Sequence, residues 1–147
     1  MEKVTNNSNT QVIQDRILEP LNLKNTFFSL DDIDQDKLMS GYYVGVEEDI
    51  KSTNYHSMIA TAQDVGIFVK ALNTGKLLTK EENEIYSSIY VYDHTGLIPG
   101  YQSIAKYHEN TDTVVIQFVN TANFEGYTWN ISEIVYDRIL KILEKRN

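Results

Sequence analysis

The chain has 147 residues, of which 41% are hydrophobic and 23% charged, and its net charge is −8 at pH 7. This length and composition fit one soluble globular domain over residues 1–147 with a single core. The acidic balance argues against nucleic-acid binding, which needs Lys and Arg to neutralise phosphates. The absence of cysteine excludes disulfides, a thiolate nucleophile and cysteine-based zinc sites.

The N-terminal region shows no targeting pattern. The first thirty residues lack a basic start followed by an apolar core, so we expect no signal peptide. No apolar run reaches the length of a membrane span. The compartment is left open by the sequence.

Helix-capping residues occur at several positions along the chain. A Ser, Thr or Asn before an apolar stripe predicts a helix start, and Gly or Pro predicts its end. The predicted helices cover residues 9–18 after Ser8, a segment from Thr61 to Gly75, a short segment after Thr79, and residues 130–145. The last helix carries six apolar residues that we expect to lie on a sheet: Ile131, Ile134, Val135, Ile139, Ile142 and Leu143.

The predicted sheet lies between residues 86 and 121. Residues 86–95 alternate loosely and are rich in Tyr and Val, and residues 101–108 and 113–120 form two strands joined by the polar turn 109–112. Residues 113–120 are almost continuously apolar, which is typical of a strand that is buried on both faces or central in its sheet. We therefore predict an α+β fold with an antiparallel sheet of about three strands and a long C-terminal helix packed on it.

Several short segments carry a family pattern in a fixed order. The order matters because a lone His-Thr-Gly tripeptide is a weak signal. The matching segments are Ile17–Thr26, Ser40–Tyr42, Ala60–Val65, His94–Gly96, Pro99–Ser103 and Val119–Thr121, with Glu2–Thr5 as a weaker match. Together they resemble the serine penicillin-recognising enzymes, which include class C β-lactamases, DD-peptidases and related esterases.

The resemblance covers roughly the C-terminal half of the family domain, so it implies a partial β-lactamase/transpeptidase-like fold. The family's SxxK and YxN motifs, which supply the nucleophilic serine, its lysine and a tyrosine, belong further upstream and have no match here. The one SxxK match, Ser103–Lys106, falls in a predicted strand. Residues i and i+3 of a strand point to opposite faces, so this pair cannot act as nucleophile and base.

The resemblance assigns substrate-binding roles to the third family motif. It implies that His94 supplies a polar or cationic group near a substrate carboxylate and that Thr95 donates a hydrogen bond to it. Gly96 lets the substrate backbone approach, and the amide of Leu97 serves as one oxyanion-hole donor if the site is completed. The alternative for His94 is a surface histidine at a strand end.

Other polar clusters are weaker candidates. The spacing of three acidic residues resembles the start of an EF-hand calcium loop: Asp32, Asp34 and Asp36. The loop also needs glycine at its sixth position and a bidentate Glu at its twelfth, and here these positions hold Lys37 and Tyr43. A solvated acidic loop explains them better. His56 and His108 lack partners at metal spacing, and we interpret both as surface residues. We expect no metal and no cofactor.

Two functional classes follow from the resemblance. The first is a C-terminal portion of an acyl-transferring serine hydrolase for β-lactams, D-alanyl peptides or esters, inactive unless an N-terminal half completes it. The second is a non-catalytic descendant that binds cell-wall peptides or serves assembly. In either class, strand 113–120 would lack its family partner strand. An exposed strand edge recruits another chain, so we expect a homo-oligomer or the missing half as partner. Relatives act in the bacterial cell envelope or outside the cell.

Overall fold

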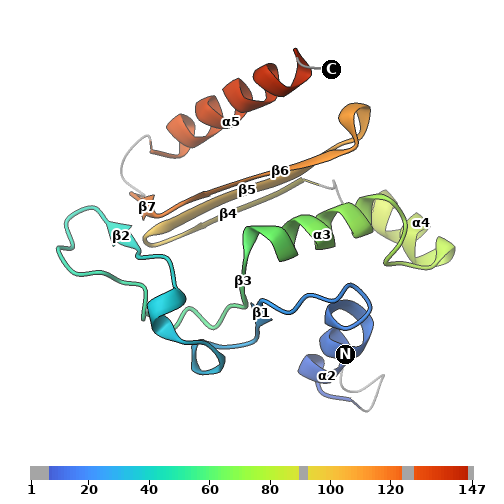
Figure 1. The fold of residues 1–147 in the computed structure, drawn as a ribbon, viewed down its shortest axis with the longest axis horizontal. Coiled ribbons are helices and arrows are strands. Elements are labelled where there is room, and N and C mark those ends of the chain that lie inside the picture. Colours follow the sequence, from blue (N-terminus) through green and yellow to red (C-terminus); the bar gives the residue numbers. More distant parts are fainter. Residues whose placement is uncertain (1–6, 90–92, 124–127, 146–147) are drawn as a thin grey trace.

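The computed structural model describes residues 7–89, 93–123 and 128–145. Figure 1 shows a three-stranded sheet with α5 on one face and α3 on the other, while the N-terminal segment lies beyond α3. The elements are α2 (Asn9–Ile13), π-helical η1 (Gln14–Leu18), β1 (Thr26–Phe27), η2 (Leu30–Asp32), η3 (Gln35–Lys37), β2 (Tyr42–Tyr43), β3 (Ile59–Ala60), α3 (Ala62–Asn73), α4 (Lys80–Ile89), β4 (Asp93–Ile98), β5 (Tyr101–His108), η4 (Glu109–Thr111), β6 (Thr113–Val119), β7 (Thr121–Ala122) and α5 (Thr128–Glu144).

The sheet confirms the predicted α+β fold. Its strand order is β4-β5-β6, and both pairs are antiparallel. A two-residue turn at Pro99 and Gly100 closes the first hairpin, where Gly100 has a φ of +80° that favours glycine. The second hairpin turns through η4 and the left-handed Asp112, with a φ of 47°. None of the helices in the described ranges is long and apolar enough to cross a membrane.

The prediction of a strand from residue 86 is wrong at its start. Residues 86–89 complete α4, and β4 begins at Asp93. Thr79 and Glu82 form a reciprocal capping box, with the two backbone amides bonded to the side chains at 2.9 and 3.2 Å. This cap starts the helix, which then continues through Ile89. The helix therefore forms in place of the strand that the loose alternation of Tyr and Val predicted. Residues 90–92 of the predicted strand lie outside the described part.

Helix α5 lies on the sheet as predicted, but through a different face. Its buried side is built around Tyr136, which is 2% exposed and packs against Ile104 and Val115. Trp129, Leu140 and Leu143 pack around this cluster. The other five residues predicted to face the sheet are exposed to solvent, with Ile131 at 59% and Ile142 at 55%. The helix therefore carries two adjacent apolar stripes, and the stripe with the larger, aromatic side chains packs on the sheet.

A polar network also ties α5 to the sheet. The Ser132 hydroxyl donates to the Gln102 side chain at 2.6 Å, and the Gln102 amide donates to the Thr121 carbonyl at 2.8 Å. Gln117 donates to the Ser132 carbonyl at 3.0 Å. Ser132 is buried, so this bonding compensates the cost of burying its hydroxyl.

Candidate substrate-binding cleft

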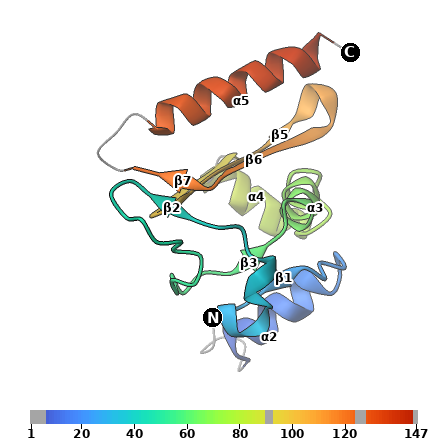
Figure 2. The same cartoon turned by 60° about the vertical axis from the view of Figure 1, so that its left-hand side comes forward.

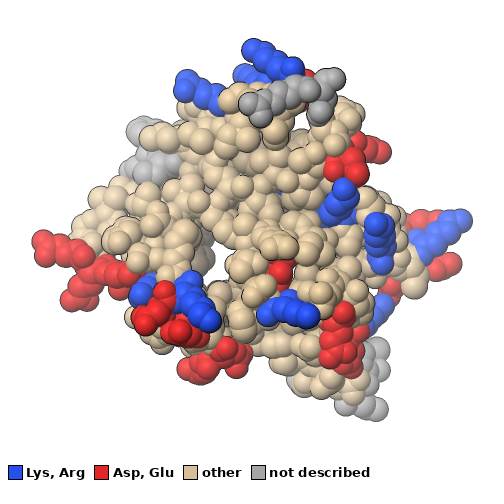
Figure 3. All heavy atoms as spheres, viewed as in Figure 1, with Lys and Arg blue, Asp and Glu red and all other residues tan. Residues whose placement is uncertain are grey.

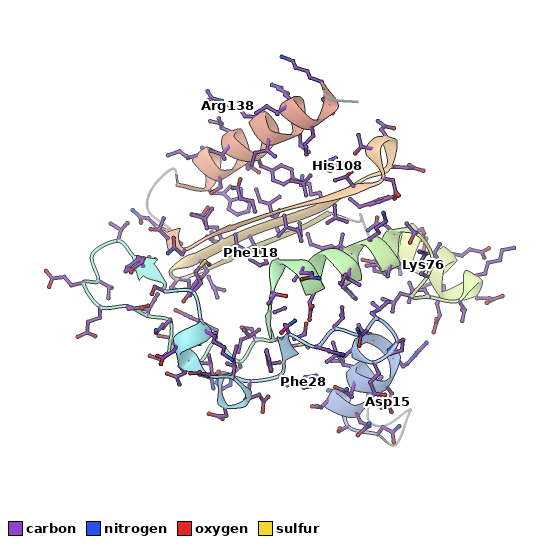
Figure 4. All side chains as sticks on the ribbon, in the orientation of Figure 1. Asp15, Phe28, Lys76, His108, Phe118 and Arg138 are labelled. Atoms are coloured by element: carbon purple, nitrogen blue, oxygen red, sulfur yellow. The ribbon has the colours of Figure 1, made fainter. Side chains whose placement is uncertain are left out.

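A cleft of about 710 Å³ lies between the sheet face opposite α5 and the loops that surround β1 to β3. One wall comprises β4 and the start of β5, including His94 to Ile98, and the other comprises apolar loop residues such as Phe27, Leu38 and Ile59. Figure 3 shows an opening on this side of the molecule. In Figure 4, Phe118, which also lines the cleft, lies on the sheet side facing away from α5, whereas His108 lies between sheet and helix.

The register of the first hairpin divides the four predicted site residues between two faces. His94 pairs with Ala105 and Gly96 with Ser103, so their side chains share the sheet face of the cleft. Thr95 and Leu97 alternate with them and belong to the face of Ile104 and Gln102. All four residues line the cleft, because β4 is an edge strand of this sheet.

Gly96 is fitted to its cross-strand neighbour. A Cβ atom at this position would lie 2.6 Å from the Ser103 hydroxyl oxygen, well inside contact distance. The absence of a side chain at Gly96 therefore leaves room for the Ser103 side chain of the same molecule. This packing is a reason for glycine in addition to the substrate approach inferred from the sequence.

His94 presents an unsatisfied nitrogen. Its Nε2 atom is buried and has no hydrogen-bond partner among the described residues. A buried imidazole nitrogen without a partner is costly.

The SxxK-like segment occupies β5 as expected. Ser103 lies on the cleft face against Gly96, while the amine of Lys106 lies 6.0 Å from the centre of the Tyr136 ring under α5. The two side chains thus point to opposite sides of the sheet. Ser103 and Lys106 cannot exchange a proton in this fold.

Two family-like segments interlock at the closed end of the hairpin. The Tyr101 ring lies across Gly41, where a Cβ would be 2.4 Å from the ring, and its hydroxyl donates to the Met39 carbonyl at 2.8 Å. A Cβ on Gly100 would meet Ile50 at 2.5 Å. Gly41 therefore leaves room for Tyr101, and Gly100 leaves room for Ile50. These close contacts hold the hairpin against the loop wall of the cleft.

Asp64 joins two more of these segments. Its carboxylate accepts from the Asn25 amide at 2.8 Å and from the Thr26 hydroxyl at 2.9 Å, and the side chain is buried at 4% exposure. Thr61 caps α3 by accepting from the Asp64 amide at 3.2 Å. The start of α3 is thereby tied to β1 at the cleft wall.

The other candidates have local structural roles. Asp32 and Asp34 accept hydrogen bonds from the Ser29 and Asp36 amides and so stabilise η2 and η3. The interpretation of His108 as a surface residue is wrong, because it is half-buried and its Nε2 lies 3.0 Å from the Tyr136 hydroxyl. In the described ranges, no three His, Asp or Glu side chains are grouped to hold a metal ion.

The sequence matches the family model described as Beta-lactamase over residues 1–88. This segment is more than half of the chain, which therefore belongs to the beta-lactamase family. It includes the loop wall and α3 but not the His94 hairpin. No curated protein matches the chain.

Solved structures extend the similarity to the hairpin and α5. The D-amino acid amidase from Ochrobactrum anthropi SV3, complexed with L-phenylalanine amide, matches with a TM-score of 0.78 and 19% identity, covering 99% of this chain and 54% of the amidase. A D-stereospecific amidohydrolase from Streptomyces sp. matches with a TM-score of 0.68 and 19% identity, covering 82% of this chain and 46% of that chain. The chain thus has a β-lactamase-like fold and spans about half the length of these structures.

Proposed function

We propose that this chain forms the substrate-binding half of a β-lactamase-like serine hydrolase. In this proposal His94 and Thr95 bind a polar or anionic substrate group and Gly96 lets the substrate backbone approach. The substrate is a β-lactam, a D-alanyl peptide, an ester or, as the neighbours suggest, a D-amino acid amide. The observation that carries the proposal is the position of β4, a sheet-edge strand that forms one wall of the cleft of about 710 Å³.

The hairpin register supports Leu97 as the oxyanion donor. In a two-residue hairpin the closing pair, here Ile98 and Tyr101, exchanges both backbone hydrogen bonds, and the following pairs alternate. Leu97 opposite Gln102 is then a non-hydrogen-bonded pair, and its N–H points away from β5 at the open edge of β4. A preorganised donor of this kind contributes about 3 kcal/mol to transition-state stabilisation.

Catalysis requires groups from outside this chain in our proposal. Ser103 and Lys106 are separated by the sheet, and the sequence has no other SxxK segment. The chain alone is inactive and acts when a polypeptide with the serine, lysine and tyrosine completes the site. The free edge of strand 113–120 is the proposed contact for that polypeptide, or for a second copy.

Fluorescent penicillin with intact-mass analysis tests this assignment. We expect no covalent adduct on the isolated chain and no hydrolysis of D-phenylalanine amide. An acyl adduct would show that a nucleophile exists here and would overturn the proposed division of the site. Reversible binding of these compounds without an adduct is also what a non-catalytic binding module would show. An in-frame SxxK and YxN in the adjoining coding DNA would separate the hydrolase from that second candidate.

A further inference from the structure

Tyr55 anchors an otherwise exposed part of the loop wall. Residues 52–58 are exposed to solvent except Tyr55, which is half-buried. Its hydroxyl donates to the carbonyl of Pro99 at 3.2 Å, and Pro99 is the first residue of the β4–β5 turn. Figure 2 shows the loop that carries Tyr55 leaving β2 beside β7 and running to β3. The Tyr55 hydroxyl therefore joins this loop to the hairpin of the candidate site.

Short-range hydrogen bonds define the backbone on both sides of Tyr55. The Thr53 amide donates to the Ile50 carbonyl at 2.9 Å, and the His56 amide donates to the Asn54 side chain at 2.8 Å. The second bond forms an Asx-turn with Tyr55 at its centre, and His56 follows with a φ of 53°. The position of Tyr55 is thus set by the residues next to it in the sequence.

The Tyr55 bond is accompanied by two further contacts between the loops and the closed end of the hairpin. A Cβ atom on Gly100 would lie 2.5 Å from Ile50, and the Tyr101 hydroxyl donates to the Met39 carbonyl at 2.8 Å. Three successive hairpin residues therefore each contact the loop wall. Removing the Tyr55 hydroxyl leaves the other two contacts in place, so the hairpin should stay docked while the turn gains freedom.

The carbonyl that Tyr55 binds belongs to the turn that follows β4 directly. The closing pair of the hairpin, Ile98 and Tyr101, exchanges both backbone hydrogen bonds, and Leu97 is the residue before this pair. A movement of the turn therefore changes the direction of the Leu97 amide. Groups that bind or stabilise a reacting molecule must be held within about 0.5 Å of their productive position. The Tyr55 bond restricts the turn at the end of the strand where this precision is needed.

We propose that Tyr55 is a positioning residue, whose hydrogen bond to Pro99 holds the end of β4 in the arrangement that binds the substrate. Tyr55 acts through the backbone of the turn and does not need to touch the substrate itself. This role rests on the proposed function, in which Leu97 is the oxyanion donor. The contacts that produce it all lie between described residues of this chain.

Amide hydrogen exchange in the ligand-free chain tests whether Tyr55 holds the turn. Tyr55→Phe removes only the hydroxyl, and exchange at Ile98 and Tyr101 should accelerate about fivefold because one hydrogen bond no longer opposes local opening. Tyr107→Phe is the matched control, since the Tyr107 hydroxyl also bonds one acceptor, at 3.0 Å, but at the opposite end of β5. The control should leave both exchange rates unchanged. Circular dichroism establishes that each variant is folded.

A benzylpenicillin titration of the same variants by amide NMR tests the effect on binding. The Kd should rise about threefold in Tyr55→Phe, because lost preorganisation weakens binding, and stay unchanged in Tyr107→Phe. Weaker binding without faster exchange would make Tyr55 a direct ligand contact, and faster exchange with unchanged binding would make its bond only structural. Either result would overturn the positioning role while leaving the proposed function intact. A wild-type chain that binds no benzylpenicillin would contradict the proposed function together with this role.

Discussion

The ring of Tyr101 lies across Gly41, and the Tyr101 hydroxyl donates a 2.8 Å hydrogen bond to the carbonyl of Met39. Tyr101 follows the β4–β5 turn, and Gly41 precedes β2. Their contact holds the strand of the candidate site against the opposite wall of the cleft. The width of the cleft therefore depends on Gly41, a glycine that does not line the cleft.

Gly41→Ala should destabilise the protein by about 2 to 3 kcal/mol. The new methyl group would overlap the Tyr101 ring and displace its hydrogen bond. Urea denaturation followed by circular dichroism measures the change. Gly66→Ala is the control, because its Cβ would lie 3.4 Å from Ile116 and alanine favours the interior of α3. Equal stability of the two variants would contradict this packing.

Gly96 and Ser103 should behave as a coupled pair. Gly96→Ala alone should cost about 1 to 2 kcal/mol, since its methyl group would overlap the Ser103 hydroxyl. Adding Ser103→Ala removes that oxygen and should recover most of the loss. A double-mutant cycle in urea measures the coupling free energy. Additive effects would mean that Gly96 is required for another reason.

Asp64→Ala should cost about 3 kcal/mol. The substitution leaves the Asn25 amide and the Thr26 hydroxyl without their shared buried acceptor. Thr26→Val removes one of these two hydrogen bonds and should cost about 1 kcal/mol. Thermal and urea unfolding should rank the two variants in this order. The reverse order would show that Asp64 does not carry the connection between α3 and β1.

Asp49 should contribute to the acid sensitivity of the fold. The carboxylate of Asp49 accepts hydrogen bonds from the Ser40 hydroxyl and from the Gly41 amide. These bonds, the Ser40 bond more than the Gly41 bond, lower the pKa of Asp49 below its usual range. A lowered folded-state pKa gives stability that is present above the unfolded value, about 4, and lost as the pH falls through the folded value. Asp49→Asn should therefore narrow the difference in melting temperature between pH 7 and pH 3. Glu47→Gln on the same loop is the control, and an equal narrowing there would refute the specific role.

The sequence predicted those elements whose signals are local. Thr61 and Thr79 mark helix starts correctly because a cap needs only neighbouring amides. The hairpin of β5 and β6 follows from the polar turn 109–112 between two predicted strands. The sheet-facing side of α5 was missed because five apolar residues outside the core form a regular stripe of their own. Ser132 lies in the buried face only because Gln102, thirty positions earlier, accepts its hydrogen bond.

The candidate site was predicted as a strand but not as a cleft. The order of the motifs indicates that His94 to Leu97 belong to one functional strand. Only the fold brings Met39 to Tyr101 and Asn25 to Asp64, since these contacts span 62 and 39 positions of the chain. The fit of Gly96 to Ser103 also depends on strand register, which composition does not determine.

The central claim is that β4 binds substrate in a chain that has no nucleophile of its own. A titration with benzylpenicillin, followed by amide NMR and intact-mass analysis, tests it most directly. We predict reversible shifts concentrated at His94 to Leu97, the Leu97 amide included, and an unchanged mass. Covalent acylation of the chain, or shifts confined to residues outside the cleft, would contradict this account.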